Sequence, residues 1–180
     1  MKKLSIILVI ILSGLFVFGF CLNQNQVSST QVLDTSNFLR IHIKANSEEA
    51  LDQSIKYKIK DEFVNYLTPM LAYCQDKQQA LNCVKSNLSF LNEIANRILQ
   101  QNNLSYSSKT NITNEFFPTR SYDGYVLPSG YYDTITVSLG EGSGNNWWCV
   151  VYPPLCFTNN NSQNIVYKSK IMEIINKFFN

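Results

Sequence analysis

The sequence predicts an α+β fold, with helices packed on one face of a mainly antiparallel sheet and an N-terminal hydrophobic signal or anchor helix in front. Three observations lead to this prediction. One early segment alternates with period two, and two later segments are apolar at helical spacing. A stretch rich in Thr, Tyr, Phe, Val and Ile then follows, divided by turns that contain Gly or Pro. The 180 residues have room for one domain and a targeting segment.

The N-terminal segment is an uncharged apolar run over residues 4–22, preceded by two lysines. A helix that crosses a bilayer needs about 20 apolar residues, whereas a signal-peptide core needs roughly 7–15. We therefore expect residues 1–22 to be a membrane anchor with its start in the cytoplasm, and a cleaved signal peptide is the alternative. Residues 23–37 are polar and indicate a flexible linker, so residues 38–180 are expected to form an extracytoplasmic domain.

The first segment of that domain, residues 38–45, alternates between apolar and polar side chains. Arg40, His42 and Lys44 fall on the polar face, which predicts a half-buried strand with His42 as a surface or second-layer hydrogen-bonding residue.

Two helices are expected next. Asn46 and Ser47 offer a cap for a helix that ends before Pro69. A second helix is expected to begin at Asp76, with Asn102 and Asn103 closing it.

Strands are expected after the helices, followed by one more helix. The predicted strands cover residues 105–113, 115–119, 131–139 and 146–152. The final helix carries Ile171, Ile174, Ile175 and Phe178 on one face, and we expect this face to pack against the domain, with a membrane surface as the alternative.

Four cysteines lie in the exported part of the chain, where disulfides can persist. Their short spacings favour the pairs Cys74–Cys83 and Cys149–Cys156, although free buried thiols are an alternative for the second pair. A zinc site built from Cys149, Cys156 and His42 lacks a fourth ligand and the usual close cysteine spacing, so no metal and no cofactor is expected.

Charge and loop composition exclude further classes of function. The net charge is +2 and the lysines are scattered, so we expect no binding to nucleic acid. The glycine-rich residues 140–144 lack a following Lys-Ser/Thr and are expected to form a hairpin turn, not a phosphate-binding loop. Glu141 is expected at the tip of that turn.

Three motifs in the same order resemble stage II sporulation protein R. They are Leu-Arg-Ile-His-Ile-Lys-Ala-Asn-Ser at residues 39–47, Phe-Pro-Thr followed by Tyr-Asp-Gly and Leu-Pro-Ser-Gly within residues 117–130, and the block at residues 140–157 that contains Trp-Trp-Cys-Val and Pro-Pro-Leu-Cys-Phe. The resemblance covers nearly the whole chain. Cys74 and Cys83 depart from the family pattern.

The resemblance implies a signalling protein of sporulation that is not itself an enzyme. Such a protein would be exported from the forespore into the space between forespore and mother cell. There it would activate a membrane-embedded aspartic protease, its expected partner, which processes an early mother-cell pro-sigma factor. Two alternatives are an exported cysteine hydrolase with Cys149 as nucleophile and His42 as base, and a cell-wall-binding module.

Candidate partner-binding residues gather in the motifs: His42, Asn46, Glu141, Asn146, Trp147 and Trp148. Adjacent residues of a strand point to opposite faces, so one of the two tryptophans is expected to enter the core and the other to be exposed. An exposed tryptophan suits a protein-binding hot spot, whereas core packing and contact with a membrane are the alternatives.

Overall fold

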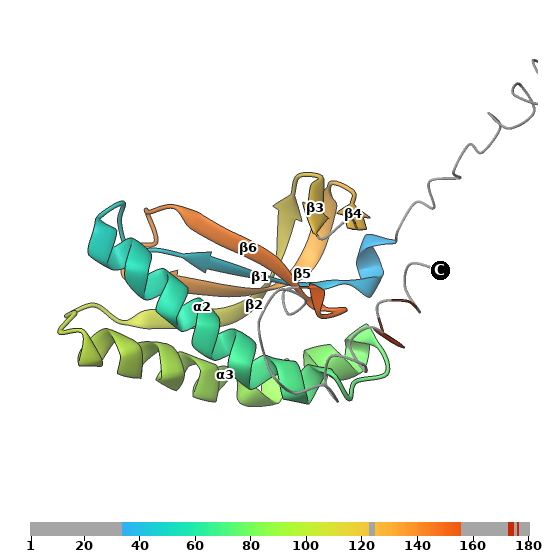
Figure 1. The fold of residues 1–180 in the computed structure, drawn as a ribbon, viewed down its shortest axis with the longest axis horizontal. Helices are drawn as coiled ribbons and strands as arrows, with labels where there is room; N and C mark the ends of the chain where they lie inside the picture. The colour runs from blue at the N-terminus through green and yellow to red at the C-terminus, as the bar shows by residue number, and fades with distance from the viewer. Residues whose placement is uncertain (1–33, 123–124, 156–172, 175, 177–180) are drawn as a thin grey trace, which may run out of the picture. The chain divides into compact units, whose positions relative to one another are not determined.

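The computed structural model describes residues 34–122, 125–155, 173–174 and 176 (Figure 1). The chain divides into two units, Met1–Val32 and Leu33–Asn180, and the described residues all belong to the second. The predicted anchor lies outside the described residues, and so do most of the linker and Cys156. Within the part that is described, no helix is long and apolar enough to cross a membrane.

The elements confirm the α+β prediction. In chain order they are the 3-10 helix η1 (Thr35–Asn37), β1 (Leu39–Lys44), α2 (Ala50–Leu71), α3 (Lys77–Gln101), β2 (Ser108–Phe117), β3 (Arg120–Tyr122), β4 (Tyr125–Leu127), β5 (Gly130–Leu139) and β6 (Asn146–Tyr152). Four of the strands form one sheet in the order β2-β5-β1-β6, and β3 pairs with β4 in a separate hairpin.

The central strand pair of the sheet is parallel. β1 runs parallel to β5, with Ile41 opposite Ile135, whereas β1–β6 and β2–β5 are antiparallel. The sheet is therefore mainly antiparallel, as the sequence predicts. The parallel pair was not predicted, because alternation within a strand does not show which distant strand becomes its neighbour.

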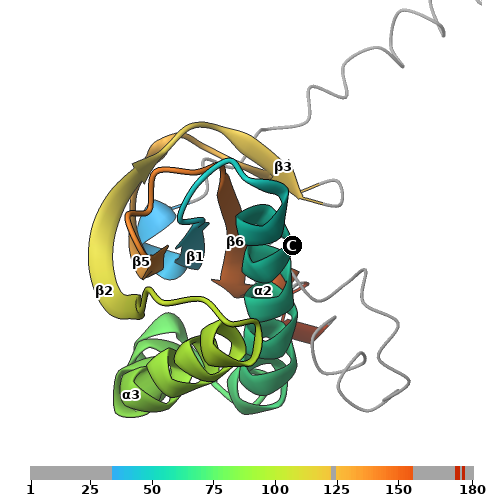
Figure 2. The same cartoon turned by 90° about the vertical axis from the view of Figure 1, so that its left-hand side faces the viewer.

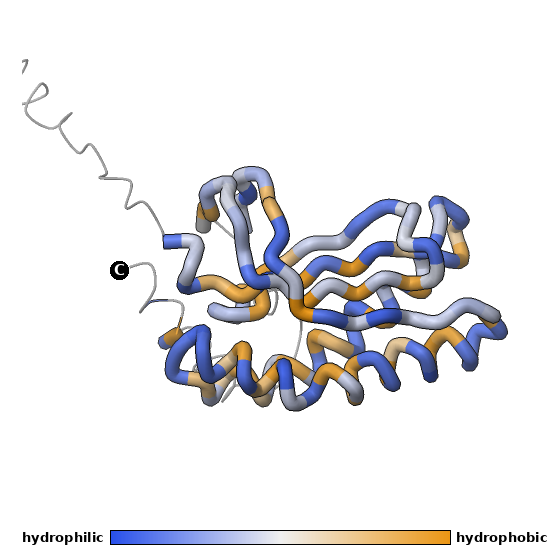
Figure 3. The backbone as a smooth tube through the Cα atoms, turned by 180° about the vertical axis from the view of Figure 1, so that it is seen from behind, coloured by the Kyte–Doolittle hydropathy of each residue, from blue (hydrophilic) through white to orange (hydrophobic). Residues whose placement is uncertain are grey.

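Both helices cover the same face of the sheet. Figures 1 and 2 show α2 and α3 side by side on one face, with the β3–β4 hairpin on the other. The helical stripe formed by Ile55, Ile59, Phe63 and Leu67 is fully or almost fully buried. Figure 3 shows hydrophobic and hydrophilic residues alternating along these helices. Full burial of one such side chain stabilises the fold by roughly 1.5–3 kcal/mol, so this packing holds the sheet rigid.

The ends of the helices agree only in part with the prediction. Asp76 caps α3 by accepting from the backbone N–H of Gln79 at 2.8 Å, as expected. The cap residue of α2 is Glu49, without a side-chain hydrogen bond, so the predicted capping by Asn46 and Ser47 is wrong. The expected end before Pro69 is also wrong, because α2 continues to Leu71. Pro69 has no backbone N–H to donate to the Asn65 carbonyl, and the helix continues past it for only two residues.

The outer face of the sheet, away from the helices, is more covered than the sequence indicated. Residues 105–119 were expected as two strands, but β2 is continuous from Ser108 to Phe117 and leads into the β3–β4 hairpin. The hairpin lies over β1, which is buried along nearly its whole length and is not half-buried. Of the expected C-terminal helix, residues 173, 174 and 176 are described as helical, and Ile174 joins the core.

Candidate functional site

The loops that carry two of the sequence motifs hold each other in place. Asp52, buried near the start of α2, accepts hydrogen bonds from Asn46 Nδ2 at 2.8 Å, Ser47 Oγ at 2.6 Å and Tyr106 OH at 2.5 Å. Burial by itself would raise the pKa of Asp52, but these donors outweigh it and hold the pKa below its usual value. Asp52, Asn46, Ser47 and Tyr106 form what we call the loop latch.

The glycine-rich turn packs directly on this latch. Gly140 has φ +53°, and a Cβ atom there would lie 2.1 Å from Asn46 Oδ1. The same oxygen accepts from the backbone N–H of Glu141 at 3.0 Å, while the Glu141 side chain is exposed. A Cβ atom on Gly144 would likewise lie 2.1 Å from the backbone carbonyl oxygen of Ser47. The glycines are therefore needed for close backbone approach, and Asn46 serves the structure of the loops.

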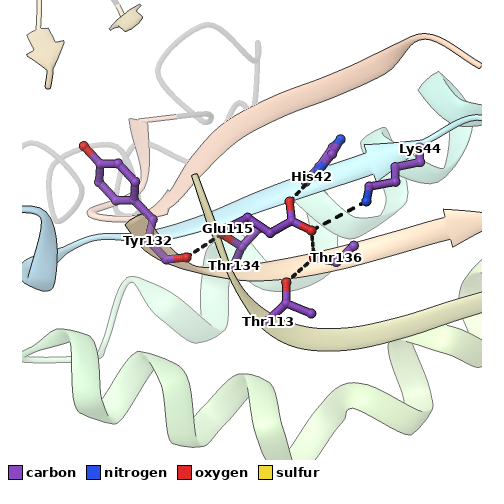
Figure 4. Close-up of polar contacts among 7 residues, drawn as sticks. All are labelled: His42, Lys44, Thr113, Glu115, Tyr132, Thr134 and Thr136. Carbon is purple, nitrogen blue, oxygen red and sulfur yellow. Dashed lines mark hydrogen bonds and ion pairs between the residues drawn. The ribbon is translucent and has the colours of Figure 1, made fainter. Parts of the chain in front are cut away.

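A polar cluster occupies the middle of the outer face (Figure 4). His42 Nδ1 lies 2.7 Å from Glu115 Oε2, and Lys44 Nζ lies 3.6 Å from Glu115 Oε1. Thr136 Oγ1 donates to Glu115 Oε1 at 3.0 Å and lies 2.6 Å from Thr113 Oγ1. We call these five residues the outer-face cluster. They come from β1, β2 and β5, which places side chains from distant parts of the sequence around one carboxylate.

Glu115 is the electrostatic centre of the outer-face cluster. Its partial burial would raise the carboxyl pKa, but the hydrogen bonds from His42 and Thr136, together with the charges of His42 and Lys44, lower the pKa below its usual value. The side chain of His42 is 9% exposed, whereas those of Glu115 and Lys44 are 23% and 30% exposed. The carboxylate and the lysine are therefore within reach of a partner.

Trp148 flanks the cluster. It lies opposite His42 in the β1–β6 register, with ring centroids 5.4 Å apart, and the exposed Arg120 places its guanidinium 5.3 Å from the Trp148 ring. His42 Nε2 is buried and has no hydrogen-bond partner among the described residues. The outer face therefore combines a half-buried indole, cationic groups and an unused imidazole nitrogen.

The two tryptophans point to opposite faces, as predicted. Trp147 lies opposite Ile43 and packs against the helix-side core, whereas Trp148 belongs to the outer face. Both are half-buried, so neither is fully exposed. Asn146 is exposed at the start of β6, opposite Lys44.

A buried arginine fastens the hairpin to the outer face. Arg40 is fully buried, and its guanidinium carbon lies 3.9 Å from the Phe117 ring centroid, 4.9 Å from that of Tyr132 and 5.3 Å from that of Tyr122. Its Nη2 donates to the Tyr122 hydroxyl. Desolvation lowers the pKa of Arg40, and its Nε and Nη1 have no partner among the described residues. The aromatic rings therefore supply most of the stabilisation of this charge.

The proposed pairing of Cys149 and His42 as nucleophile and base is wrong. Cys149 lies opposite Ile41, and His42 lies opposite Trp148, so the two side chains point to opposite faces of the sheet. Cys149 is also disulfide-bonded, which removes its nucleophilic thiol. Its expected partner Cys156 lies outside the described residues, so that pairing stays a prediction. Within the described residues, no group of three or more His, Cys, Asp and Glu side chains could hold a metal ion.

The predicted disulfide between Cys74 and Cys83 is wrong for this structure. Both are free thiols, with sulfur atoms 3.8 Å apart, whereas a disulfide bond measures about 2.05 Å. Cys74 follows the end of α2, and its Sγ donates instead to the Met70 carbonyl at 3.7 Å. Burial, followed by the hydrogen bond with Cys83, raises the pKa of Cys74 to about 12.

Several residues of the site were missed at the level of sequence. The alternation of β1 placed Lys44 beside His42, but Glu115, Thr113 and Thr136 gave no signal because their positions depend on how β2, β5 and β1 align. Arg120 and the aromatic rings around Arg40 were also missed. A motif of the form Leu-Arg-x-His could have indicated that both polar residues of β1 face one environment.

The fold and the site together define a small α+β domain whose outer sheet face displays a histidine–carboxylate cluster beside a tryptophan. The family model for stage II sporulation protein R matches residues 35–162. The stage II sporulation protein R of Bacillus subtilis (strain 168) is 33% identical over 162 residues, which cover 87% of this chain and 72% of that protein. No solved structure matches significantly. The chain belongs to the stage II sporulation protein R family.

Proposed function

We propose that this protein is an exported sporulation signal that activates a membrane-embedded aspartic protease, which then processes an early mother-cell pro-sigma factor. Membership of the stage II sporulation protein R family supports a signalling role in sporulation. The apolar residues 4–22 support export from the forespore into the intermembrane space, with the N-terminal segment either kept as a tether or cleaved. The protein provides the contact, and its partner performs the proteolysis.

We further propose that the outer face is the surface that contacts the protease. The observation that carries this proposal is that Arg120 lies over the Trp148 ring, beside a cluster in which Lys44 pairs with the partly exposed Glu115 carboxylate. A half-buried indole beside cationic side chains is typical of binding hot spots. The partly exposed lysine and the exposed arginine fit an acidic or carbonyl-rich loop of the partner, because both side chains donate hydrogen bonds and neither accepts them.

Co-expression of this chain, the protease and the pro-sigma factor tests the proposal. Trp148→Ala and Arg120→Glu are expected to reduce processing at least tenfold while the protein level stays within twofold. Tyr57→Ala is the matched control, because Tyr57 is an exposed aromatic residue on α2, away from the outer face. This variant is expected to leave processing unchanged.

Two results would contradict the proposal. Processing of the pro-sigma factor without this chain would remove its role as activator. Normal processing by both outer-face variants would instead move the contact to another surface. A pulldown on peptidoglycan tests the alternative of a cell-wall-binding module. A signalling domain is expected to stay in the unbound fraction, whereas a cell-wall-binding module would be retained.

A further inference from the structure

Exposed apolar side chains gather at one end of the domain. Among the described residues, the four most exposed large hydrophobic side chains are 55–66% exposed, and the remaining three are 41–49% exposed. The first group consists of Tyr73, Phe116, Val126 and Tyr131, and the second of Leu51, Tyr57 and Phe90. Exposed apolar side chains that lie together mark contact surfaces, and among these residues Phe116 and Tyr131 are in direct ring contact.

Strand register places Phe116 and Tyr131 next to each other. They are directly opposite in the β2–β5 pair, with ring centroids 5.6 Å apart in an edge-to-face arrangement. Val126 belongs to the β3–β4 hairpin, which is rooted between Phe117 and Gly130. In the β2–β5 register, Phe117 and Gly130 form the pair next to Phe116 and Tyr131. The hairpin therefore begins and ends beside the exposed aromatic pair.

Tyr73 reaches the same end through the turn between α2 and α3. The next residue, Cys74, accepts a hydrogen bond at its carbonyl from the Tyr152 hydroxyl at 3.3 Å. Tyr152 lies opposite Leu39, at the start of β1. The start of β1, the start of β5 and the α2–α3 turn therefore lie at one end, which we call the linker end.

The described chain begins at this end, with η1. Thr35 of η1 lies so close to Gly130 that a Cβ atom on the glycine would be 3.0 Å from Thr35 Cγ2. Figure 1 shows η1 beside the hairpin, at the end of the sheet where β1 begins. If residues 23–33 form the flexible linker that the sequence predicts, their root-mean-square span is only about 20 Å. A tether at residues 4–22 would therefore hold the linker end close to the membrane.

We infer that the linker end rests on the surface of the lipid bilayer, with Phe116 and Tyr131 in the interfacial layer. Tyrosine favours this layer, because its apolar ring and its polar hydroxyl can both be satisfied there, and Phe116 adds an apolar ring beside it. This contact rests on the tether that the proposed function includes. It orients the domain so that the far end, where β1 ends at Lys44 and β6 begins at Asn146, points away from the bilayer.

Depth-dependent fluorescence quenching tests this contact with the full chain and no protease. The chain carries Trp147→Phe and Trp148→Phe and one new tryptophan, either Phe116→Trp or Tyr131→Trp. It is reconstituted into phosphatidylcholine–phosphatidylglycerol vesicles with brominated acyl chains. Tyr57→Trp in the same background is the matched control, because Tyr57 is an exposed aromatic residue outside the linker end. Circular dichroism confirms that each variant is folded.

The expected result is at least threefold stronger quenching at positions 116 and 131 than at position 57. Equal quenching at all three positions would overturn the contact, and so would quenching at 116 only after the protease is added, which would indicate protein docking. Processing of the pro-sigma factor is measured separately in cells. Loss of the bilayer contact in vesicles is therefore distinguishable from failure of the proposed activation.

Discussion

His42 Nδ1 lies 2.7 Å from Glu115 Oε2, although the two residues are 73 positions apart in the chain. The pair joins the central strand β1 to the edge strand β2 across β5. Because Thr136 of β5 donates to the same carboxylate, three strands share one acceptor. These contacts tie the three strands together on the outer face, the face that carries Trp148 and Lys44.

We expect Glu115→Gln to destabilise the fold by about 1–2 kcal/mol at pH 7, because hydrogen bonds to a charged group are stronger than those to a neutral one. The folded-state pKa of Glu115 lies below the reference value of 4.5. The stabilisation is therefore complete above pH 4.5 and is lost as the pH falls through the folded-state pKa. Urea unfolding between pH 7 and pH 3 measures this loss of stability in wild type and variant. Glu141→Gln, on an exposed side chain, is the control, and a difference from wild type that does not depend on pH would contradict the assignment.

Alanine substitutions at Gly140 and Gly142 in the glycine-rich turn are expected to destabilise the fold to different extents. Gly142→Ala is expected to cost about 1–2 kcal/mol, because φ is +63° but the nearest neighbour of a Cβ atom is 3.6 Å away. Gly140→Ala adds a clash with Asn46 Oδ1 at 2.1 Å to a similar conformational cost, so it is expected to be clearly more destabilising. Thermal unfolding compares the two. Equal melting temperatures would show that the loops do not pack as described.

Two replacements of Arg40 separate the effect of losing side-chain volume from the effect of losing the charge. Arg40→Ala is expected to cost about 3 kcal/mol or more, because it leaves a cavity among Phe117, Tyr122 and Tyr132. Arg40→Met fills most of that space and avoids a buried charge, so it is expected to cost clearly less. Urea unfolding gives the stabilities, and the rate of tryptic cleavage after Arg120 reports whether the hairpin detaches. Cleavage as slow in Arg40→Ala as in wild type would contradict the role of Arg40 in fastening the hairpin.

The cysteines are expected to differ in reactivity. With a pKa of about 12, only about one Cys74 side chain in ten thousand is a thiolate at pH 8, so iodoacetamide is expected to modify the half-buried Cys83 first. Cys149 is expected to stay unmodified in the unfolded, unreduced protein because it is disulfide-bonded. Peptide mass spectrometry after alkylation measures the extent of modification at all three cysteines. Labelling of Cys149 without reductant would contradict this assignment.

Features set by neighbouring residues were predictable from the sequence. The cap at Asp76 depends on a residue three positions away, and Asn103, whose φ is +58°, closes α3 where the paired asparagines indicated. The alternation of residues 38–45 correctly separated His42 and Lys44 from the apolar face. These inferences need only a local period and the chemistry of one side chain.

Features set by distant contacts were not predictable. Asn46 and Ser47 have good cap chemistry, but the buried Asp52 competes for their side chains and is satisfied together with Tyr106. The polar face of β1 gave no sign that Arg40 would be enclosed by rings from β2, β3 and β5. Glu115 was assigned to a separate strand, because its role depends on the register that brings β2, β5 and β1 together.

The position of β1 has a consequence for the timing of folding. The first strand of the domain occupies a central place in the sheet, and both of its neighbours, β5 and β6, come from the last part of the described sequence. Such long-range pairings form slowly, because a large loop must close before either edge of β1 is satisfied. A chain that enters a translocation channel from its N-terminus, as the proposed export requires, cannot complete this sheet until β6 has emerged. The topology therefore delays assembly of the His42–Trp148 contact until β6 is available to pair with β1.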